Sequence, residues 1–196
     1  SVTEDKVYTV YYLANGSTAY KVQYLQQKVD GSGYDVVDEL PLSATTGTVV
    51  TAPDREYAGF TGKGDLPSAE VAADGGTVLQ VYYDRNTYAI YYHTNGGSYI
   101  DPTVALYGAD VSQPSDPTRA GYDFAGWYVD ETLENAYKHP STMPATDQSV
   151  YAKWEPKSST KYTVVYWLEN ATNDGYDYGG IKTMYARPGT TVSSRS

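Results

Sequence analysis

Oxygen-bearing side chains gather in a glycine-rich stretch near the start of the chain, and they are the first candidates for chemistry. In Asp30-Gly31-Ser32-Gly33-Tyr34-Asp35, two carboxylates flank a hydroxyl-bearing segment. Calcium prefers oxygen ligands of this kind, so Asp30 and Asp35 are candidate calcium ligands. The stretch lacks the further acidic ligands and the closing glutamate of an EF-hand loop. Aspartate and glycine also suit a hairpin turn, and this second interpretation is favoured.

Large aromatic side chains are the second group that could bind a ligand. The chain contains 23 tyrosines and three tryptophans. Exposed rings could form a platform for a host glycan or protein, and the candidates are Trp127, Tyr128, Trp154, Tyr166 and Trp167. Because alternate side chains of a strand face outward, some exposed tyrosines are expected without any function. A sheet edge that accepts a partner's strand is a rival mode of binding.

Groups suited to catalysis are scarce. The chain has no cysteine, which excludes disulfides, thiolate nucleophiles and cysteine metal sites. Only His93 and His139 are available as a general base, and the turn or proline that follows each of them predicts a solvated loop. No glycine cluster leads into a convincing helix for phosphate binding. The sequence therefore predicts a non-enzymatic protein without catalytic residues or a cofactor.

Charge narrows the classes of partner. There are 14 basic and 24 acidic side chains, giving a net charge of −10, and no basic run stands out. Nucleic acids and anionic membranes would be repelled. No segment approaches the roughly 20 apolar residues that span a bilayer, so no membrane insertion is expected from these residues. Glycans, proteins and neighbouring repeats of the same chain remain as partners.

The elements that must position these side chains are strands that recur in pairs. Alternating apolar and polar residues indicate strands, because successive side chains of a strand point to opposite faces. Each pair is interpreted as the last strand of one module followed by the first strand of the next. The pairs are residues 7–12 with 20–24, 78–83 with 88–92, and 150–154 with 162–166.

The first and third modules match without gaps at an offset of 142 residues, whereas the middle module is of another type. Tyr20, Val22 and Tyr24 return as Tyr162, Val164 and Tyr166. This predicts a tandem array with four parts: the last strand of a preceding repeat (1–16), two complete modules (17–86 and 87–157) and the first part of a third (158–196). Both ends of the chain are expected to be cuts within the array.

The predicted fold class is mainly β. Glycine and asparagine clusters such as Asp74-Gly75-Gly76 and Asn95-Gly96-Gly97 tolerate the positive φ angles of tight hairpins and separate the strands. One short helix per module is compatible with the pattern. The best candidate is Pro102 to Ala109, for which a loop is the alternative.

Four blocks of the middle module resemble the Listeria-Bacteroides repeat, the B-repeat type found in internalin B and many cell-wall-anchored proteins. They follow the order and spacing of that family over most of residues 88–154. The blocks are YAIYYHTNGGS (88–98), VALYGADV (104–111), DPTRAGYDFAGWYVD (116–130) and VYAKW (150–154).

The first module and the visible part of the third resemble mucin-binding-protein-like repeats of Gram-positive surface proteins. The matching text is YKVQYLQQ (20–27), TTGTVV (45–50), YAGF (57–60) and VLQVYYDRNT (78–87). Both resemblances imply small β-grasp-like modules outside the cell, in a protein anchored to the cell wall. They also imply a role as a spacer or adhesin stalk.

The distinctive aromatic residues of the middle module have a structural interpretation too. Tyr122, Phe124 and Trp127 supply large apolar areas that a module of this size needs for its core. The leading prediction is therefore a non-enzymatic stalk, and the alternative is a module that binds a host glycan or protein. A further hypothesis is head-to-tail strand donation between chains. The alternative, which is favoured, is that the ends of the fragment are arbitrary boundaries.

Overall fold

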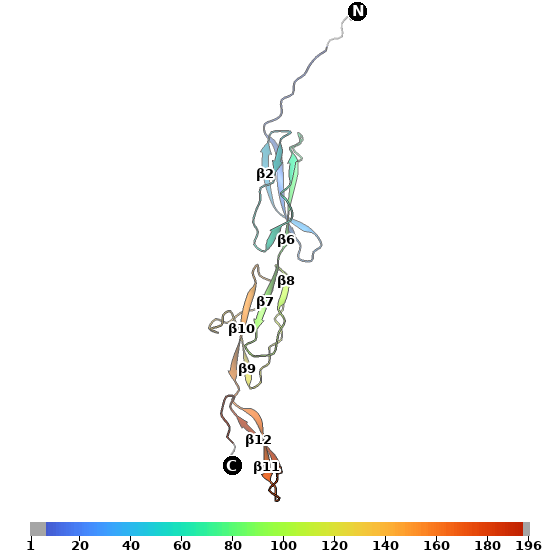
Figure 1. Ribbon diagram of the computed structural model, residues 1–196. Coiled ribbons are helices and arrows are strands. Elements are labelled where there is room, and N and C mark those ends of the chain that lie inside the picture. Colours follow the sequence, from blue (N-terminus) through green and yellow to red (C-terminus); the bar gives the residue numbers. More distant parts are fainter. Residues whose placement is uncertain (1–6, 194–196) are drawn as a thin grey trace, which may run out of the picture. The chain divides into compact units, whose positions relative to one another are not determined.

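The computed structural model describes residues 7–193, and within them all regular structure is β-strand (Figure 1). The chain forms two compact units. The first unit contains the residues up to Tyr88 with Ala105–Ala109 and Thr142–Thr146, and the second contains the remainder. The strands are β1 (Thr18–Gln27), β2 (Tyr34–Ala44), β3 (Val49–Thr51), β4 (Phe60–Gly62), β5 (Ser68–Glu70), β6 (Val78–Arg85), β7 (Thr87–His93), β8 (Thr103–Leu106), β9 (Tyr122–Tyr128), β10 (Gln148–Pro156), β11 (Thr160–Glu169) and β12 (Tyr176–Ala186).

A four-stranded sheet in the order β2-β1-β6-β4 forms the centre of the first unit. β1 pairs antiparallel with β2 and parallel with β6, and β4 pairs antiparallel with β6. Alternation decides which face is buried, so Val22 and Tyr24 of β1 lie in the core with Val81 of β6. The two-stranded ribbon of β3 and β5 covers this face, because Val50 and Ala69 pack against the same core.

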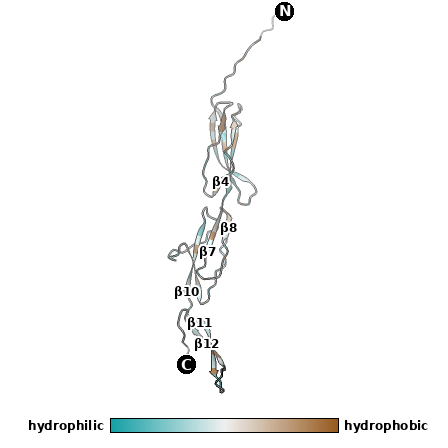
Figure 2. Ribbon diagram, viewed as in Figure 1, coloured by the Kyte–Doolittle hydropathy of each residue, from teal (hydrophilic) through white to brown (hydrophobic). Residues whose placement is uncertain are grey.

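A second four-stranded sheet, in the order β8-β7-β10-β9, has most of its residues in the second unit. β7 and β10 are parallel, and β9 pairs antiparallel with β10. Ile90, Val150 and Trp127 are buried in its core. In both sheets, therefore, the first strand lies between the second strand and the last one. Figure 2 colours the strands by hydropathy, and hydrophobic and hydrophilic residues occur along the same strands. Such a mixture is expected where only one face of a sheet is buried.

The hairpin of β11 and β12 reproduces the hairpin of β1 and β2 at the predicted offset of 142 residues. The limits of both strands agree at this offset, and a bulge follows Tyr166 as it follows Tyr24. The turn agrees as well, because Asn173 takes a positive φ of 61° where Gly31 has 72°. The predicted strands at 20–24, 78–83, 88–92, 150–154 and 162–166 are all confirmed.

The expectation of a helix at Pro102–Ala109 was wrong. Residues Thr103–Leu106 form β8, which joins the second sheet beside β7. Thr103 and Val104 are β-branched and favour extended backbone. The neighbouring strand β7 supplies partners for the backbone N–H and C=O groups of β8. No described segment forms a helix of the length and apolar character needed to cross a membrane.

The predicted strand at residues 7–12 does not form in this structure. Residues 7–15 have no regular structure, and Val7, Tyr8 and Tyr12 are largely exposed. Alternation makes a segment able to form a strand, but a strand also needs a neighbour to satisfy its N–H and C=O groups. Residues 1–6 of the predicted preceding repeat lie outside the described residues.

Candidate functional site

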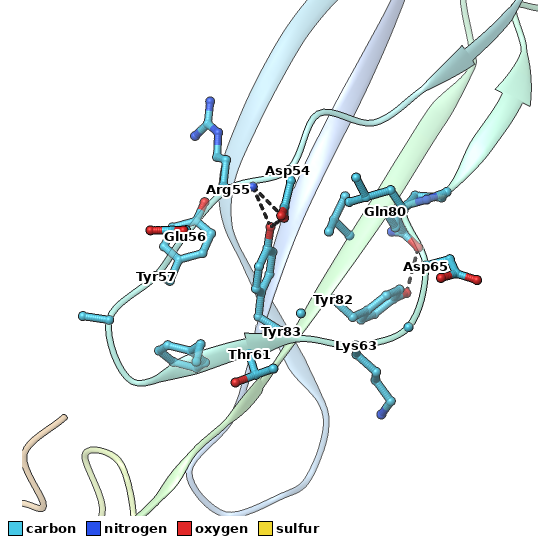
Figure 3. Close-up of a pocket in the computed structure, with 17 residues that line it drawn as sticks. Asp54, Arg55, Glu56, Tyr57, Thr61, Lys63, Asp65, Gln80, Tyr82 and Tyr83 are labelled. Carbon is cyan, nitrogen blue, oxygen red and sulfur yellow. Dashed lines mark hydrogen bonds between the residues drawn. The ribbon is translucent and has the colours of Figure 1, made fainter. Parts of the chain in front are cut away.

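A groove of about 870 Å³ opens in the first unit, between the segment of residues 54–67 and strand β6 (Figure 3). The segment follows β6 only briefly, because β4 is three residues long and its pairing ends where the Lys63 N–H donates to the Tyr82 carbonyl (2.8 Å). Beyond Lys63 the segment leaves the strand, and Ala52 closes its base through a hydrogen bond to the Pro67 carbonyl. The short β4 therefore creates the groove.

Tyr83 connects the floor of the groove to its rim. Its ring is buried, and its hydroxyl donates to Asp54 Oδ1 (3.2 Å) and accepts from the backbone N–H of Arg55 (3.1 Å). Burial raises the pKa of the Tyr83 hydroxyl. This side chain thus holds the start of the segment in place as a neutral hydrogen-bonding group.

The Arg55 side chain points away from the groove (Figure 3). Its guanidinium lies 4.3 Å from the centre of the Tyr24 ring and pairs with the Asp38 carboxylate. The Tyr24 hydroxyl donates to the Pro53 carbonyl (3.1 Å), so the segment is tied to β1 on both sides of Asp54. These contacts make the wall of the groove a fixed surface rather than a loose loop.

Tyr57 and Glu56 lie on the same side of the groove as Arg55 (Figure 3). The Tyr57 ring packs edge-on against Tyr83 at 5.0 Å, and its buried hydroxyl makes no hydrogen bond within residues 7–193. Burial raises the pKa of Tyr57, because the charged form would lose its hydration. A buried hydroxyl without a partner costs free energy, so this atom is a local weak point of the fold.

Tyr57→Phe is therefore expected to leave the free energy of unfolding unchanged or to raise it by up to about 1 kcal/mol, because it removes an unpaired polar atom. The matched change Tyr83→Phe also removes a tyrosine hydroxyl, but one that makes two hydrogen bonds. It is expected to lower the free energy of unfolding by about 1–2 kcal/mol. Urea unfolding followed by circular dichroism measures both. Equal losses in the two variants would contradict the different environments of the two hydroxyls.

The other wall of the groove carries Tyr82, Gln80 and Asp65 (Figure 3). The Tyr82 hydroxyl donates to Gln80 Oε1 (2.9 Å), and its ring meets Tyr34 at 5.0 Å. Lys63 donates to the Tyr34 hydroxyl (2.6 Å), and this hydrogen bond raises the pKa of the Lys63 ammonium. The groove therefore combines aromatic rings, an amide and carboxylates on one surface.

This arrangement suits recognition better than catalysis. Rings and hydrogen-bonding groups line the groove, whereas a catalytic site needs an activated nucleophile or a base held against its target. Among residues 7–193 no three His, Asp or Glu side chains come together as a metal site would require. No sequence pattern indicates this groove, because its existence depends on how far the segment 54–67 departs from β6.

The calcium candidates Asp30 and Asp35 both have internal partners. Asp30 Oδ1 accepts the backbone N–H of Ser32 (2.9 Å), and this hydrogen bond lowers the pKa of the carboxyl. Asp35 faces the Lys28 ammonium at 3.3 Å. Gly31 and Gly33 take positive φ angles in the same turn. These contacts are those of a hairpin turn that joins β1 to β2.

Three of the five aromatic platform candidates lie in the second unit's sheet. Trp127 is 5 % exposed and packs against Tyr92 and Phe124 at 5.2 and 5.3 Å. Trp154 packs on Phe124 at 5.6 Å and donates its Nε1–H to the Thr94 carbonyl (2.8 Å). Tyr128 lies beneath the Lys153 ammonium. Trp127 and Trp154 thus hold the sheet and a turn together.

Tyr166 and Trp167 lie on another sheet, in strand β11. Tyr166 is 44 % exposed and Trp167 is 60 % exposed. Trp167 meets Tyr178 of β12 at 6.0 Å, in an edge-on contact. The five candidate residues are therefore divided between two sheets of the second unit, and the exposed ones belong to the hairpin.

His139 differs from the expected solvated loop residue. It is half-buried, its Nδ1–H donates to the Pro140 carbonyl (2.8 Å), and its Nε2 accepts from the Tyr92 hydroxyl (3.2 Å). The carbonyl can only accept, which fixes this tautomer. His93 is exposed as expected, but it ends strand β7 and stacks on Tyr151 at 4.6 Å. Neither histidine faces a serine or cysteine nucleophile among the contacts described.

Tyr137 beside His139 should ionise late. Burial raises its pKa to about 12, and its hydroxyl donates to Gln148 Oε1 (2.6 Å). A tyrosine in the unfolded chain ionises near pH 10. Between pH 10 and 12 this hydroxyl is therefore ionised in the unfolded chain but still protonated in the folded protein, so the free energy of unfolding falls as pH rises. The absorbance difference between the native protein and Tyr137→Phe is expected to titrate near pH 12, and near pH 10 in denaturing urea. A native midpoint near 10 would contradict the buried hydroxyl.

Comparisons with known proteins identify one part of the chain. Residues 88–153, about a third of its length, match the Listeria-Bacteroides repeat domain. Two proteins of Evansella cellulosilytica are similar over most of the chain: one named "Putative membrane protein", 28% identical over 94% of this chain, and one named "Putative Gly-rich membrane protein", 26% identical over 85%. The chain spans only 26% and 19% of the lengths of these two relatives.

Proposed function

We propose that the chain is a non-enzymatic spacer in a stalk on the bacterial cell surface, built as a tandem array of β-grasp-like modules. The match to a repeat domain supports the array, and the likeness to two proteins named as membrane proteins supports the location. The shared strand order of the two four-stranded sheets supports modules of one architecture. Anchoring to a Gram-positive cell wall and mucin-binding-like flanking modules are part of the same proposal.

The observation that carries the proposal is the parallel pairing of the first and last strands in each sheet. Because β1 and β6 run in the same direction, the chain enters the sheet at one end and leaves it at the other. β7 and β10 repeat this arrangement. A strand of eight to ten residues spans roughly 30 Å, so each module gains length along the chain instead of folding back.

The same pairing gives resistance to force. Pulling on the two ends of a module drags β1 and β6 past each other, so their hydrogen bonds are loaded together rather than one after another. The links are short as well: one residue, Asn86, separates β6 from β7, and residues 157–159 separate β10 from β11. Short links transmit load and limit free tumbling.

Single-molecule pulling tests the spacer function, and the absence of cysteine makes the attachment simple. Handles at the exposed positions Ser17→Cys and Thr87→Cys load β1 and β6 in parallel, whereas Ser17→Cys with Thr45→Cys opens the β1–β2 hairpin from its end. The first pair is expected to rupture at a severalfold higher force and to release roughly 200 Å, at about 3.4 Å per residue. Equal rupture forces would refute the load-bearing role.

A second candidate function, recognition of a host glycan, is favoured by the groove of the first unit. Its rings and its exposed carboxylates Glu56 and Asp65 offer stacking surfaces and acceptors for sugar hydroxyls. A glycan array would show saturable binding that is lost in Glu56→Gln with Asp65→Asn and kept in the remote control Asp101→Asn. Binding that is insensitive to the groove, or no binding, would remove this candidate.

A further inference from the structure

Strand β6 has a free edge inside the groove of the first unit. The Lys21 N–H donates to the Thr77 carbonyl, so the backbone groups of the odd-numbered residues from 77 to 83 face β1. Those of the even-numbered residues face the other way, toward the groove. Within residues 7–193 the N–H and C=O groups of Gln80 and the N–H of Tyr82 make no hydrogen bond. This side of the strand is therefore open to a new partner.

The groove lies around this edge and not over one face of the sheet. Val81 and Tyr83 belong to the buried face, whereas Gln80 and Tyr82 lie on the opposite face, because successive side chains of a strand alternate. All four residues line the groove, and Figure 3 shows Gln80, Tyr82 and Tyr83 around it. A hollow that is reached from both faces of one strand must lie at the edge of that strand.

The first sheet protects its opposite edge but not this one. Strand β2, at the far margin of the sheet, carries Asp35, Asp38, Glu39 and Pro41. Charged side chains and proline on an edge strand oppose the addition of a further strand. Residues 78–82 of β6 read VLQVY, without a charge or a proline. At about 3.3 Å per residue, this unprotected stretch offers roughly 15 Å of strand for pairing.

The charges around the groove indicate the chemistry of its occupant. Arg55 points away from the groove, and the Lys63 ammonium lies 3.6 Å from the Asp84 carboxylate. Glu56 and Asp65 are exposed on the lining and form no ion pair within residues 7–193. Among the described residues the groove therefore offers two free carboxylates and no free cation. Complementary charge favours an occupant that carries lysine or arginine.

We propose that the groove binds an extended, basic segment of a partner protein, which adds to the free edge of β6 as a further strand. Free N–H and C=O groups at strand spacing match another extended backbone, and pockets for alternate side chains give specificity. A glycan could use the rings and carboxylates of the groove, but it has no backbone that pairs with the strand. The binding site lies within one module, so it is independent of the spacer role of the array.

Gln80 supplies a matched pair of variants. Gln80→Pro removes an N–H that faces the groove and leaves the hydrogen bonds between β1 and β6 in place, and proline is accepted where the N–H of a strand is unpaired. Gln80→Ala keeps this N–H and removes only an exposed side chain. Loss of one backbone hydrogen bond should weaken peptide binding about tenfold in Gln80→Pro, whereas Gln80→Ala should bind as the native chain does. Circular dichroism verifies that both variants fold.

Isothermal titration calorimetry of the whole 196-residue chain with capped octapeptides tests the proposal. A peptide of alternating lysine and valine is expected to bind saturably, and the same peptide with glutamate in place of lysine is expected to bind at least about tenfold more weakly. Only alternate N–H groups of a strand face its neighbour, so N-methylation of one set, the lysines or the valines, should abolish binding and N-methylation of the other set should be tolerated.

The methylated peptides test strand pairing without any change to the protein, so they decide the matter even where Gln80→Pro does not fold. Three results would overturn the proposal: no binding of the lysine peptide, equal binding of the glutamate peptide, or equal effects of the two methylations. The last result would mean that the peptide is held by charge alone.

Discussion

Gly59→Ala is expected to lower the free energy of unfolding of the first unit by about 3 kcal/mol, a large effect for one added methyl group. Gly59 has a φ of +83°, and a Cβ there would clash with the ring of Tyr107. Strain in the left-handed region costs about 1–2 kcal/mol, and forcing the ring aside costs about 1–3 kcal/mol more. Urea unfolding, with hydrogen exchange to assign the loss to this unit, measures the change.

Gly64→Ala is the matched control, because it isolates the backbone contribution. Gly64 lies in the same unit with a φ of +74°, and nothing stands within 4 Å of an added Cβ. It is expected to lose only about 1–2 kcal/mol. Equal costs at the two glycines would mean that the Tyr107 ring moves freely and that the contact is unimportant.

The reason for the large effect is the set of contacts that holds the Tyr107 ring. The ring meets Phe60 edge-on at 5.6 Å, and Arg85 donates to the Tyr107 carbonyl (2.8 Å) while its guanidinium lies 4.8 Å from the centre of the Phe60 ring. Adding Tyr107→Ala to the Gly59→Ala chain should therefore cost less than Tyr107→Ala costs alone. This difference is a direct measure of the clash.

Trp127→Ala is expected to destabilise the second unit by about 3–5 kcal/mol, the usual cost of emptying a buried aromatic site. Trp127 packs against both Tyr92 and Phe124. Its buried Nε1 makes no hydrogen bond to any described residue, so the expected loss is one of packing. Hydrogen exchange of residues 89–156 reports the opening of this sheet. The same measurement distinguishes the two interpretations of Trp127, as a core residue and as part of a ligand platform.

Trp167→Ala is the control with the same chemistry in an exposed position. The side chain is 60 % exposed and has one ring contact described, to Tyr178. Its truncation is expected to cost no more than about 1 kcal/mol. If Trp127→Ala were as mild as Trp167→Ala, the second unit's core would have to lie elsewhere.

Local features of the fold could be predicted from the sequence because they depend on short stretches of chain. The strand limits of β11 and β12 follow from those of β1 and β2 at the offset of 142, and the bulge follows too. The alternation of apolar and polar residues and the turn residues extend over only a few positions, so they can be recognised without knowing which strands pair. The same holds for the hairpin turn at Asp30, whose hydrogen bond to Ser32 is local.

Other features could not be predicted because they join residues far apart in the sequence. The groove depends on where the segment 54–67 leaves β6, and the partners of His139 include Tyr92, 47 positions away. The segment near Pro102, expected as a helix, is strand β8, because the edge of β7 is available for pairing. The aromatic platform divided in the same way: Trp127 is buried in one sheet and Trp167 is exposed on another.

The difference between what the sequence determines and what the tertiary structure determines is clearest for one short segment that occurs twice. The sequence alone determined that residues 7–12 and 78–83 carry the same strand pattern, with four identical positions. Only the tertiary structure decided that residues 78–83 lie inside a sheet between β1 and β4 while residues 7–12 stay exposed. The physical reason is that a strand satisfies its backbone groups through neighbours, and neighbours come from the fold, not from the strand's own residues.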